Sequence, residues 1–359
     1  MIDSQSTENS IESAAKQSPI GKLLKIIVPV VVSVGLCVVM FREIDFHEMV
    51  RVIRNDCDFR WIGLMLVVNI FPVLFRALRW GIQLKASGVN APIHTLVCSI
   101  FGTYAVNLVF PRLGEVWRTS YISYNQKAPF STVLGSMIAD RFADLVAVAL
   151  LTLCTFFVAR EPIIEFVRTY PQAYTAILHF ITSPWAWVMA AALLAALRLI
   201  LSRSRNSFVQ KIRSFLSGLW GGFAAIAHMK GKFQWLGLTI CIWGCYFISM
   251  TIGFHAFAQT EQLFLNNGFV VPLVCFILTS ISMGIPSNGG IGPYQTTLLF
   301  GLLLFLPAGA DVTEFKTIGA ALGNVLIASQ TLMFIVFGLI VFALIALSKR
   351  RTPTNPQID

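Results

Sequence analysis

The chain has 359 residues, of which 56% are hydrophobic and only 12% are charged, and its mean hydropathy is +0.73. A soluble domain carries roughly twice that charged fraction, so the composition excludes a soluble globular protein and predicts an all-α, polytopic membrane protein. The net charge of +10 does not indicate a nucleic-acid partner, because basic residues in so apolar a chain set membrane topology and contact anionic head groups.

Apolar runs near the length of a bilayer crossing, about 20 residues, recur along the whole chain. A polar segment over residues 1–22 precedes the first run and is predicted to be a disordered cytoplasmic tail. One transmembrane domain is predicted over 23–347, followed by a second cytoplasmic tail over 348–359. The six predicted spans are 23–41, 61–79, 131–158, 185–201, 234–257 and 317–347.

Two further apolar segments, 93–128 and 266–307, are interrupted by Gly, Pro or charged residues. Lys and Arg residues precede the first span and follow the last, so the positive-inside rule places both termini in the cytoplasm. Alternate crossing by the six spans then makes the first broken segment begin and end inside, and the second begin and end outside. We therefore predict two re-entrant hairpins of opposite orientation. Most of the 27 Lys and Arg residues fall in the predicted cytoplasmic stretches, which favours this topology.

The halves 23–158 and 185–347 repeat the same order of elements with every direction reversed. Each half contains a span, an amphipathic stretch, a second span, a hairpin and a third span. Inverted repeats with broken helices are typical of transporters, which bind their substrate where the halves meet. We therefore predict an inverted repeat with a binding site between the two hairpins.

The second broken segment contains SMGIPSNGGIGPYQTTLLFG at residues 282–301. Irregular backbone is tolerated at membrane depth only where it is buried in protein or lines a wet cavity. Such a turn frees N–H and C=O groups that can bind a polar ligand, or it lets two half-helices pack closely. The candidate ligand-binding residues here are Ser287, Asn288, Gly289, Gly290 and Gly292 of the turn, together with Gln295.

The first broken segment contains NLVFPRLGEVWRTSYISY, which begins at Asn107 and places three charged residues at intervals of three after a proline. Two arginines, Arg112 and Arg118, offer forks suited to phosphate oxygens, and Glu115 can hold one of them in place. Charges so near the membrane interior are costly unless they pair or serve a function. These residues therefore indicate either a phosphate site, to which Asn107 would also belong, or an Arg–Glu pair that closes the cytoplasmic mouth.

The stretch GSMIADRFADLVAVALL places Asp140 and Asp144 on one helix face, with Arg141 one step round. If the helix begins near Phe130, Asp140 lies about 15 Å along it, close to the middle of the bilayer. Two carboxylates on one face need a cation nearby, and the predicted partner is Arg112 or Arg118 from the first hairpin. The pair can act as a structural ion-pair lock or as a proton relay.

Neither a metal site nor a catalytic motif is predicted. The five histidines lack metal-ligand spacing, and the seven cysteines give no disulfide framework. The GGIG sequence lacks the Lys-Ser/Thr pair that completes a phosphate loop. We therefore expect a non-enzymatic protein with no cofactor and no nucleic-acid partner.

Three stretches in this order, PRLGEVWR, ADRFADL and GIPSNGGIGPYQ, resemble motifs of the lysylphosphatidylglycerol synthase transmembrane-region family. This flippase-like family includes the membrane half of the multiple peptide resistance factor, and the resemblance covers residues from about 20 to 347. The large fused members carry a soluble aminoacyl transferase domain that we do not expect in this chain. Gln295 stands where the family commonly has Glu, so no charged role is expected there. The motif matches are Pro111, Arg112, Gly114, Glu115, Arg118, Asp140, Arg141, Asp144, Pro286, Gly289, Gly290 and Gly292.

These observations predict a bacterial inner-membrane protein that binds and translocates an anionic or phosphorylated lipid. Arg112 and Arg118 would hold the phosphate, and the backbone from Ser287 to Gly292 would donate hydrogen bonds from the other side. One alternative is an accessory partner of a separately encoded envelope-lipid or glycan enzyme. Another is a membrane-embedded lipid-modifying enzyme that uses Asp140 or Asp144 as a general base.

Overall fold

The computed structural model describes residues 46–110, 112–161, 229–285, 290–306 and 311–351, together with Ile164 and Ser287. These residues form helices and connecting turns. The predicted spans 23–41 and 185–201 and the N-terminal tail lie outside them, so the inverted repeat stays a prediction.

The first half of the described chain contains six helices. Their bounds are α3 (Phe46–Asp56), α4 (Phe59–Val68), α5 (Ile70–Ala86), α6 (Ile93–Val109), α7 (Leu113–Gln126) and α8 (Phe130–Val158). The second half ends in the longest helix. Its elements are α13 (Lys232–Phe254), α14 (Ala258–Asn267), α15 (Val270–Ser282), α16 (Pro293–Leu303) and α17 (Val312–Arg351).

Four helical segments of the described chain are long and apolar enough to cross a membrane, and they coincide with four of the predicted spans. These segments are Phe59–Ala86, Phe130–Val158, Lys232–Phe254 and Val312–Leu347. The first of them is divided into α4 and α5 at Asn69. Pro72 accounts for this break, because it has no N–H to donate to the carbonyl of Val68. The start of α8 at Phe130 agrees with the start assumed from the sequence.

Each predicted broken segment contains two helices that pack against each other, α6 with α7 and α15 with α16. The first pair is close because two glycines leave room for it. A Cβ on Gly102 would overlap the ring of Trp117, and one on Gly114 would overlap the carbonyl of Thr103. Small residues of this kind allow helices in membranes to approach closely. The interruptions were thus predicted correctly, whereas re-entry into a membrane stays a prediction.

Helix α14 was not predicted from the sequence. It ends at Gly268, which has φ 66, and α15 then leaves at an angle of 112° to α14. A positive φ is the conformation that glycine adopts without strain, so this residue permits the sharp change of direction. The predicted start of the second broken segment at residue 266 therefore lies at the end of α14.

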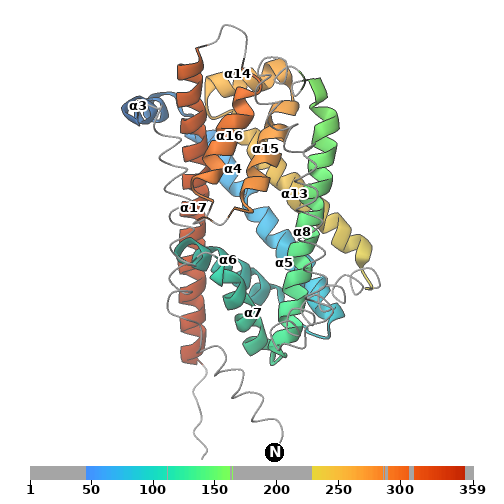
Figure 1. The fold of residues 1–359 in the computed structure, drawn as a ribbon. Helices are drawn as coiled ribbons and strands as arrows, with labels where there is room; N and C mark the ends of the chain where they lie inside the picture. The colour runs from blue at the N-terminus through green and yellow to red at the C-terminus, as the bar shows by residue number, and fades with distance from the viewer. Residues whose placement is uncertain are drawn as a thin grey trace, which may run out of the picture.

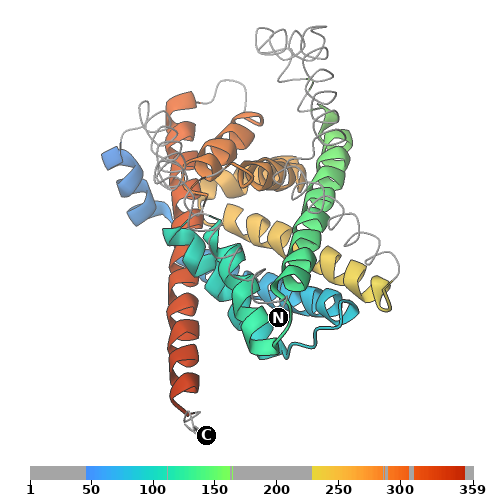
Figure 2. The same cartoon turned by 60° about the horizontal axis from the view of Figure 1, so that its bottom comes forward.

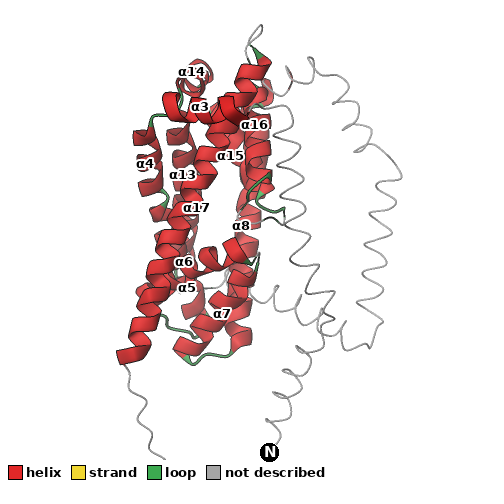
Figure 3. Cartoon of the chain, turned by 90° about the vertical axis from the view of Figure 1, so that its left-hand side faces the viewer, coloured by secondary structure: helices red, strands yellow, loops and turns green. Residues whose placement is uncertain are grey.

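The two helix pairs lie at different heights between the two long helices α17 and α8 (Figure 1). Helices α6 and α7 lie in the lower part of the view, and α15 and α16 lie in the upper part (Figures 1 and 2). Helix α17 contacts α6 and α16, and α8 contacts α7 and α15. The view from the side shows α17 running past both pairs (Figure 3). Each long helix thus connects the first broken segment to the second.

Two separate apolar cores hold these pairs in place. The upper core is built by α13 to α17 with parts of α3 and α4, and the lower core by α5 to α8 with the end of α17. Fully or almost fully buried members of the upper core are Phe254, Phe257, Leu298, Leu302 and Leu322, and those of the lower core are Trp80, Leu84, Ile100 and Ile122.

Candidate functional site

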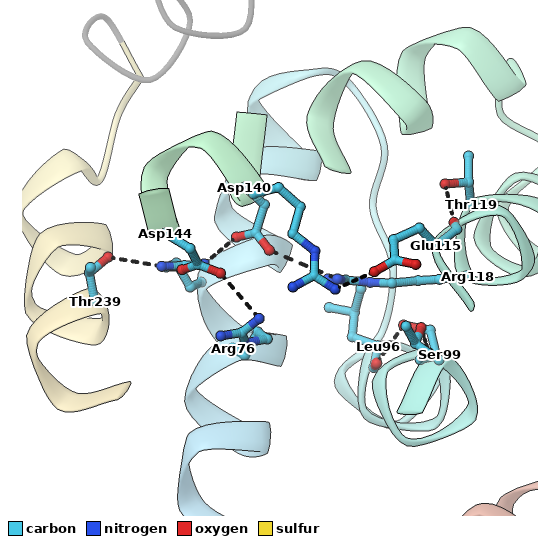
Figure 4. Close-up of polar contacts among 12 residues, drawn as sticks. Arg76, Leu96, Ser99, Glu115, Arg118, Thr119, Asp140, Asp144 and Thr239 are labelled. Carbon is cyan, nitrogen blue, oxygen red and sulfur yellow. Dashed lines mark hydrogen bonds and ion pairs between the residues drawn. The ribbon is translucent and has the colours of Figure 1, made fainter. Parts of the chain in front are cut away.

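One arginine of α5, Arg79, contacts both aspartates on one face of α8. Asp140 is fully buried, and its Oδ1 accepts a hydrogen bond from Nη2 of Arg79 at 2.7 Å. The same nitrogen donates to Oδ1 of Asp144, also at 2.7 Å. Carboxylates one helical turn apart repel each other, so the cation between them stabilises the pair. Figure 4 shows the two carboxylates facing this contact.

Two further arginines complete the charged cluster. Nη1 of Arg76, one turn before Arg79 on α5, lies 3.1 Å from Oδ2 of Asp144. Arg118 approaches from α7, and its Nη1 lies 3.9 Å from Oδ2 of Asp140 (Figure 4). Three guanidinium groups from two helices therefore surround two carboxylates from a third.

Aromatic and amide side chains fix the orientation of these groups. The guanidinium of Arg118 lies over the indole of Trp80, with Cζ 3.7 Å from the ring centre. The Gln83 amide is oriented to donate to Oδ1 of Asp140 at 3.2 Å and to accept from Nε1 of Trp235 at 3.2 Å. Helix α13 contributes Thr239, whose hydroxyl accepts from Nη1 of Arg79 at 3.4 Å. The cluster therefore lies at the junction of α5, α7, α8 and α13.

Within the described part of the chain, this cluster has one positive charge more than it has negative charges. The excess is associated with Arg118, which is 1% exposed and whose Nε and Nη2 have no hydrogen-bond partner there. Nε1 of Trp80 and Oγ of Ser136, one turn before Asp140, are also buried without a partner among the described residues. Buried polar atoms are almost always hydrogen-bonded, so an additional polar group would satisfy these atoms.

A second ion pair joins α7 to α8 in a more exposed position. Nη2 of Arg141 lies 2.6 Å from Oε1 of Glu115, and the two side chains are 38% and 21% exposed. Asn107 of α6 donates to the same Oε1 at 3.5 Å, and its Oδ1 accepts from the backbone N–H of Gly114 at 2.8 Å. Asn107 thereby satisfies one of the free N–H groups of the first turn of α7. These residues connect α6, α7 and α8.

The sequence predicts Arg112 or Arg118 as the partner of the acidic pair. Arg118 contacts Asp140 at 3.9 Å, whereas no contact joins Arg112 to either aspartate among the described residues, so the prediction is wrong for Arg112. Its Nη2 donates to the carbonyl oxygen of Gly284 at 3.1 Å, in the turn that follows α15. The physical reason is position, because Arg112 precedes the first turn of α7 whereas Arg118 lies on the part of α7 that packs against α8. The principal partner of Asp140 and Asp144 is Arg79.

The glycines of the second turn are required by backbone conformation. Gly290 and Gly292 have φ of 87 and 93, which residues with a side chain rarely adopt. The hydroxyl of Ser287 donates to the carbonyl of Ile285 at 3.4 Å. Asn288, Gly289 and Pro286 lie outside the described residues, as does Pro111 of the first turn.

Gln295 is 3% exposed and takes part in the turn itself. Its Oε1 accepts from the N–H of Gly292 at 2.7 Å, and its Nε2 donates to Oδ1 of Asn324 on α17 at 3.2 Å. The amide thus caps α16 and connects it to α17. Both of its polar atoms have protein partners.

Sequence reasoning missed Arg76 and Arg79, which lie at the end of the predicted span 61–79. A signal for them was present in the spacing, because Arg76, Arg79 and Gln83 recur at intervals of three and four on an otherwise apolar helix. Residues at this spacing share one face. A polar face on an apolar helix predicts a buried partner, and the acidic pair of α8 is that partner.

Comparison with known proteins places the chain in a family. No match was found among curated proteins or among solved structures. The family model described as "Lysylphosphatidylglycerol synthase TM region" matches residues 26–322, which is well over half of the chain. All three motifs that suggested this family lie within the matched range. The chain therefore belongs to the lysylphosphatidylglycerol synthase transmembrane-region family.

Proposed function

We propose that this protein binds and translocates a lipid with an anionic or phosphorylated head group across a bacterial inner membrane. The observation that carries the proposal is the excess positive charge buried at Arg118. A charged group in a membrane interior is costly, and such groups usually pair or mark a substrate pathway. An anion at Arg118 would supply the missing charge and accept from its two unpaired nitrogens.

A phosphate group fits this position better than a neutral ligand does. Ordered water can satisfy Nε and Nη2 of Arg118, but it cannot balance the charge. The guanidinium plane presents two parallel N–H groups that match the spacing of phosphate oxygens. Trp80 holds this plane from one face, so the fork is oriented before a ligand arrives. This preorganisation supports recognition of a phosphate within a lipid.

The arrangement of helices supports movement of the lipid between the two broken segments. Both pairs, α6–α7 and α15–α16, lie between α8 and α17, and a shift of one pair against the other would open the site to alternate sides. Helices α5 and α17 end, and α8 begins, in the lower part of Figure 1. Lys85 lies in the last turn of α5, and Lys127 follows the end of α7. We assign this side to the cytoplasm on the positive-inside rule, with both termini there.

An accessory role is the second candidate. It is favoured by the family description, which names the membrane region of a synthase. In this role the protein would present lipid to a separately encoded envelope enzyme. A catalytic role is less well supported, because Asp140 and Asp144 both face guanidinium groups and neither is free to act as a general base.

Reconstitution into phosphatidylcholine liposomes that contain a fluorescent phosphatidylglycerol tests the proposal. The wild type should expose inner-leaflet probe to an impermeant quencher, and the Arg118→Met variant should not. Arg60→Ala, which changes an exposed arginine at the start of α4, is the control and should behave as the wild type does. Absence of probe movement with the wild type would contradict translocation, and chemically altered probe would instead support the enzyme.

A further inference from the structure

The turns of the two broken segments are joined by one side chain. Arg112 precedes α7 in the first segment, and Gly284 follows α15 in the second. A hydrogen bond of 3.1 Å connects these two residues, which lie 172 positions apart in the sequence. The acceptor is a neutral backbone carbonyl. Among the described residues, no carboxylate forms an ion pair with Arg112, and both Arg112 and Gly284 are exposed.

The backbone at Arg112 is held in an unusual conformation that favours this contact. Arg112 has φ 65 and ψ −1, in the left-handed region, where a residue with a Cβ costs on the order of 1–2 kcal/mol. An arginine at the N-cap also makes no side-chain cap, and Asn107 caps α7 in its place. The local sequence therefore leaves the Arg112 side chain available to the second segment.

Different hydrogen bonds reach the two sides of the second turn. After the turn, Gln295 bonds to Gly292 and to Asn324, which fixes the start of α16 against α17. Before the turn, the amides of Gly284 and Ile285 bond only to the last residues of α15, through the carbonyls of Ile281 and Ser282. Arg112 is the contact that the described residues provide from the first segment to this side of the turn.

We infer that the hydrogen bond from Arg112 to Gly284 is a latch between the two broken segments, and that an anionic lipid head group releases it. This inference rests on the proposed function and adds how head-group binding is coupled to movement. Because Arg112 is exposed, an anionic head group can approach its guanidinium directly.

The exchange of partners follows from the strength of the bonds. The Arg112 guanidinium makes a charge-assisted hydrogen bond to either acceptor, but a phosphate also carries negative charge, which the Gly284 carbonyl lacks. A phosphate offers two oxygens to the fork, whereas the Gly284 carbonyl offers one. The head group therefore displaces the carbonyl, and the turn after α15 loses its contact with the first segment. Without an anionic head group, the hydrogen bond from Arg112 to Gly284 stays in place.

Amide hydrogen exchange of the intact protein in nanodiscs tests the latch directly. Arg112→Gly removes the side chain and suits a positive φ, so it is expected to fold without added backbone strain. In phosphatidylcholine nanodiscs, this variant should exchange the amides of Gly284 and Ile285 about tenfold faster than the wild type, because one charge-assisted contact is lost. Arg60→Ala should exchange at the wild-type rate.

Addition of phosphatidylglycerol to the nanodiscs should accelerate these two amides in the wild type and leave Arg112→Gly unchanged. An unchanged rate in Arg112→Gly without anionic lipid overturns the latch, whatever the transport assay gives. An equal response of wild type and variant to phosphatidylglycerol overturns release by the head group. Failure of transport with a faster Arg112→Gly exchange would contradict the proposed function and leave the latch in place.

Discussion

The two broken segments have the same helical plan and opposite chemistry. Both pairs pack through glycines, and both lie between α8 and α17. The first segment carries Arg112, Glu115 and Arg118, whereas the described part of the second contains no charged residue from Val270 to Leu306. The second uses positive-φ glycines and a buried amide to hold its shape. The comparison shows that an interrupted helix pair can carry charged groups in one half of a protein, whereas in the other half it is shaped by glycine backbone and an uncharged amide.

The acidic pair that supports the first segment should give the largest effect. Asp140→Ala removes the carboxylate that Arg79 and Arg118 share, so the repulsion between these two arginines is no longer compensated there. We expect the free energy of unfolding to fall by about 3–5 kcal/mol. Thermal unfolding in detergent, followed by size-exclusion chromatography, measures it. The double variant Asp140→Ala, Arg79→Met should be more stable than the sum of the two single losses predicts. Strict additivity would show that the two side chains do not interact.

Close packing within the first segment should give the next largest effect. Gly114→Ala places a methyl group against the Thr103 carbonyl and the Asn107 amide, and overpacking of this kind costs about 1–3 kcal/mol. Gly135→Ala on α8 is the matched control, because a Cβ there meets no atom within 4 Å. The control should be neutral or slightly stabilising, since alanine favours helices. Equal melting temperatures for the two variants would contradict the packing argument.

The second segment should respond to loss of its cap rather than to loss of a ligand. Gln295→Ala removes the acceptor of the Gly292 N–H and the donor to Asn324, and we expect a loss of about 1–2 kcal/mol, typical of a helix N-cap. Phosphatidylglycerol movement per folded molecule should stay at the wild-type level. If transport stops while the melting temperature is unchanged, Gln295 contacts substrate and the contrast between the segments is wrong.

The span limits and the interruptions could be predicted because apolar length and Gly/Pro content act locally. Four spans and both interruptions follow from such signals alone. The partner of Asp140 could not be predicted in the same way, because it depends on which helix packs against α8. Arg79 and Arg118 both supply suitable charge on helices that pack against α8, and only the three-dimensional arrangement places Arg79 at 2.7 Å and Arg118 at 3.9 Å from Asp140. The contact from Arg112 to Gly284 was beyond sequence reasoning, because it depends on how two turns 172 residues apart meet.

Arg118→Met should have the smallest effect on stability, although we expect it to have the largest effect on lipid movement. Arg118→Met removes a buried charge that lies over Trp80 and whose ion-pair contact with Asp140 is long, at 3.9 Å, while Arg79 and Arg76 still balance both carboxylates. The cluster of the variant is neutral, and replacing an incompletely paired buried charge by an apolar side chain is often neutral or stabilising. We therefore expect a free energy of unfolding within about 1 kcal/mol of the wild type, or higher.

Arg79→Met is the matched control for this last prediction. It removes the same group from the same cluster but leaves Asp140 with the distant Arg118 alone, so it should unfold far more readily. Thermal unfolding of both variants in phosphatidylcholine nanodiscs measures the difference. A large loss of stability in Arg118→Met would show that its charge is already satisfied within the protein, and the excess charge would no longer support an anionic ligand. If Arg118→Met is as stable as the wild type but no longer moves phosphatidylglycerol, the first broken segment binds substrate at a residue that the fold does not need. The two broken segments then differ in function as well as in chemistry.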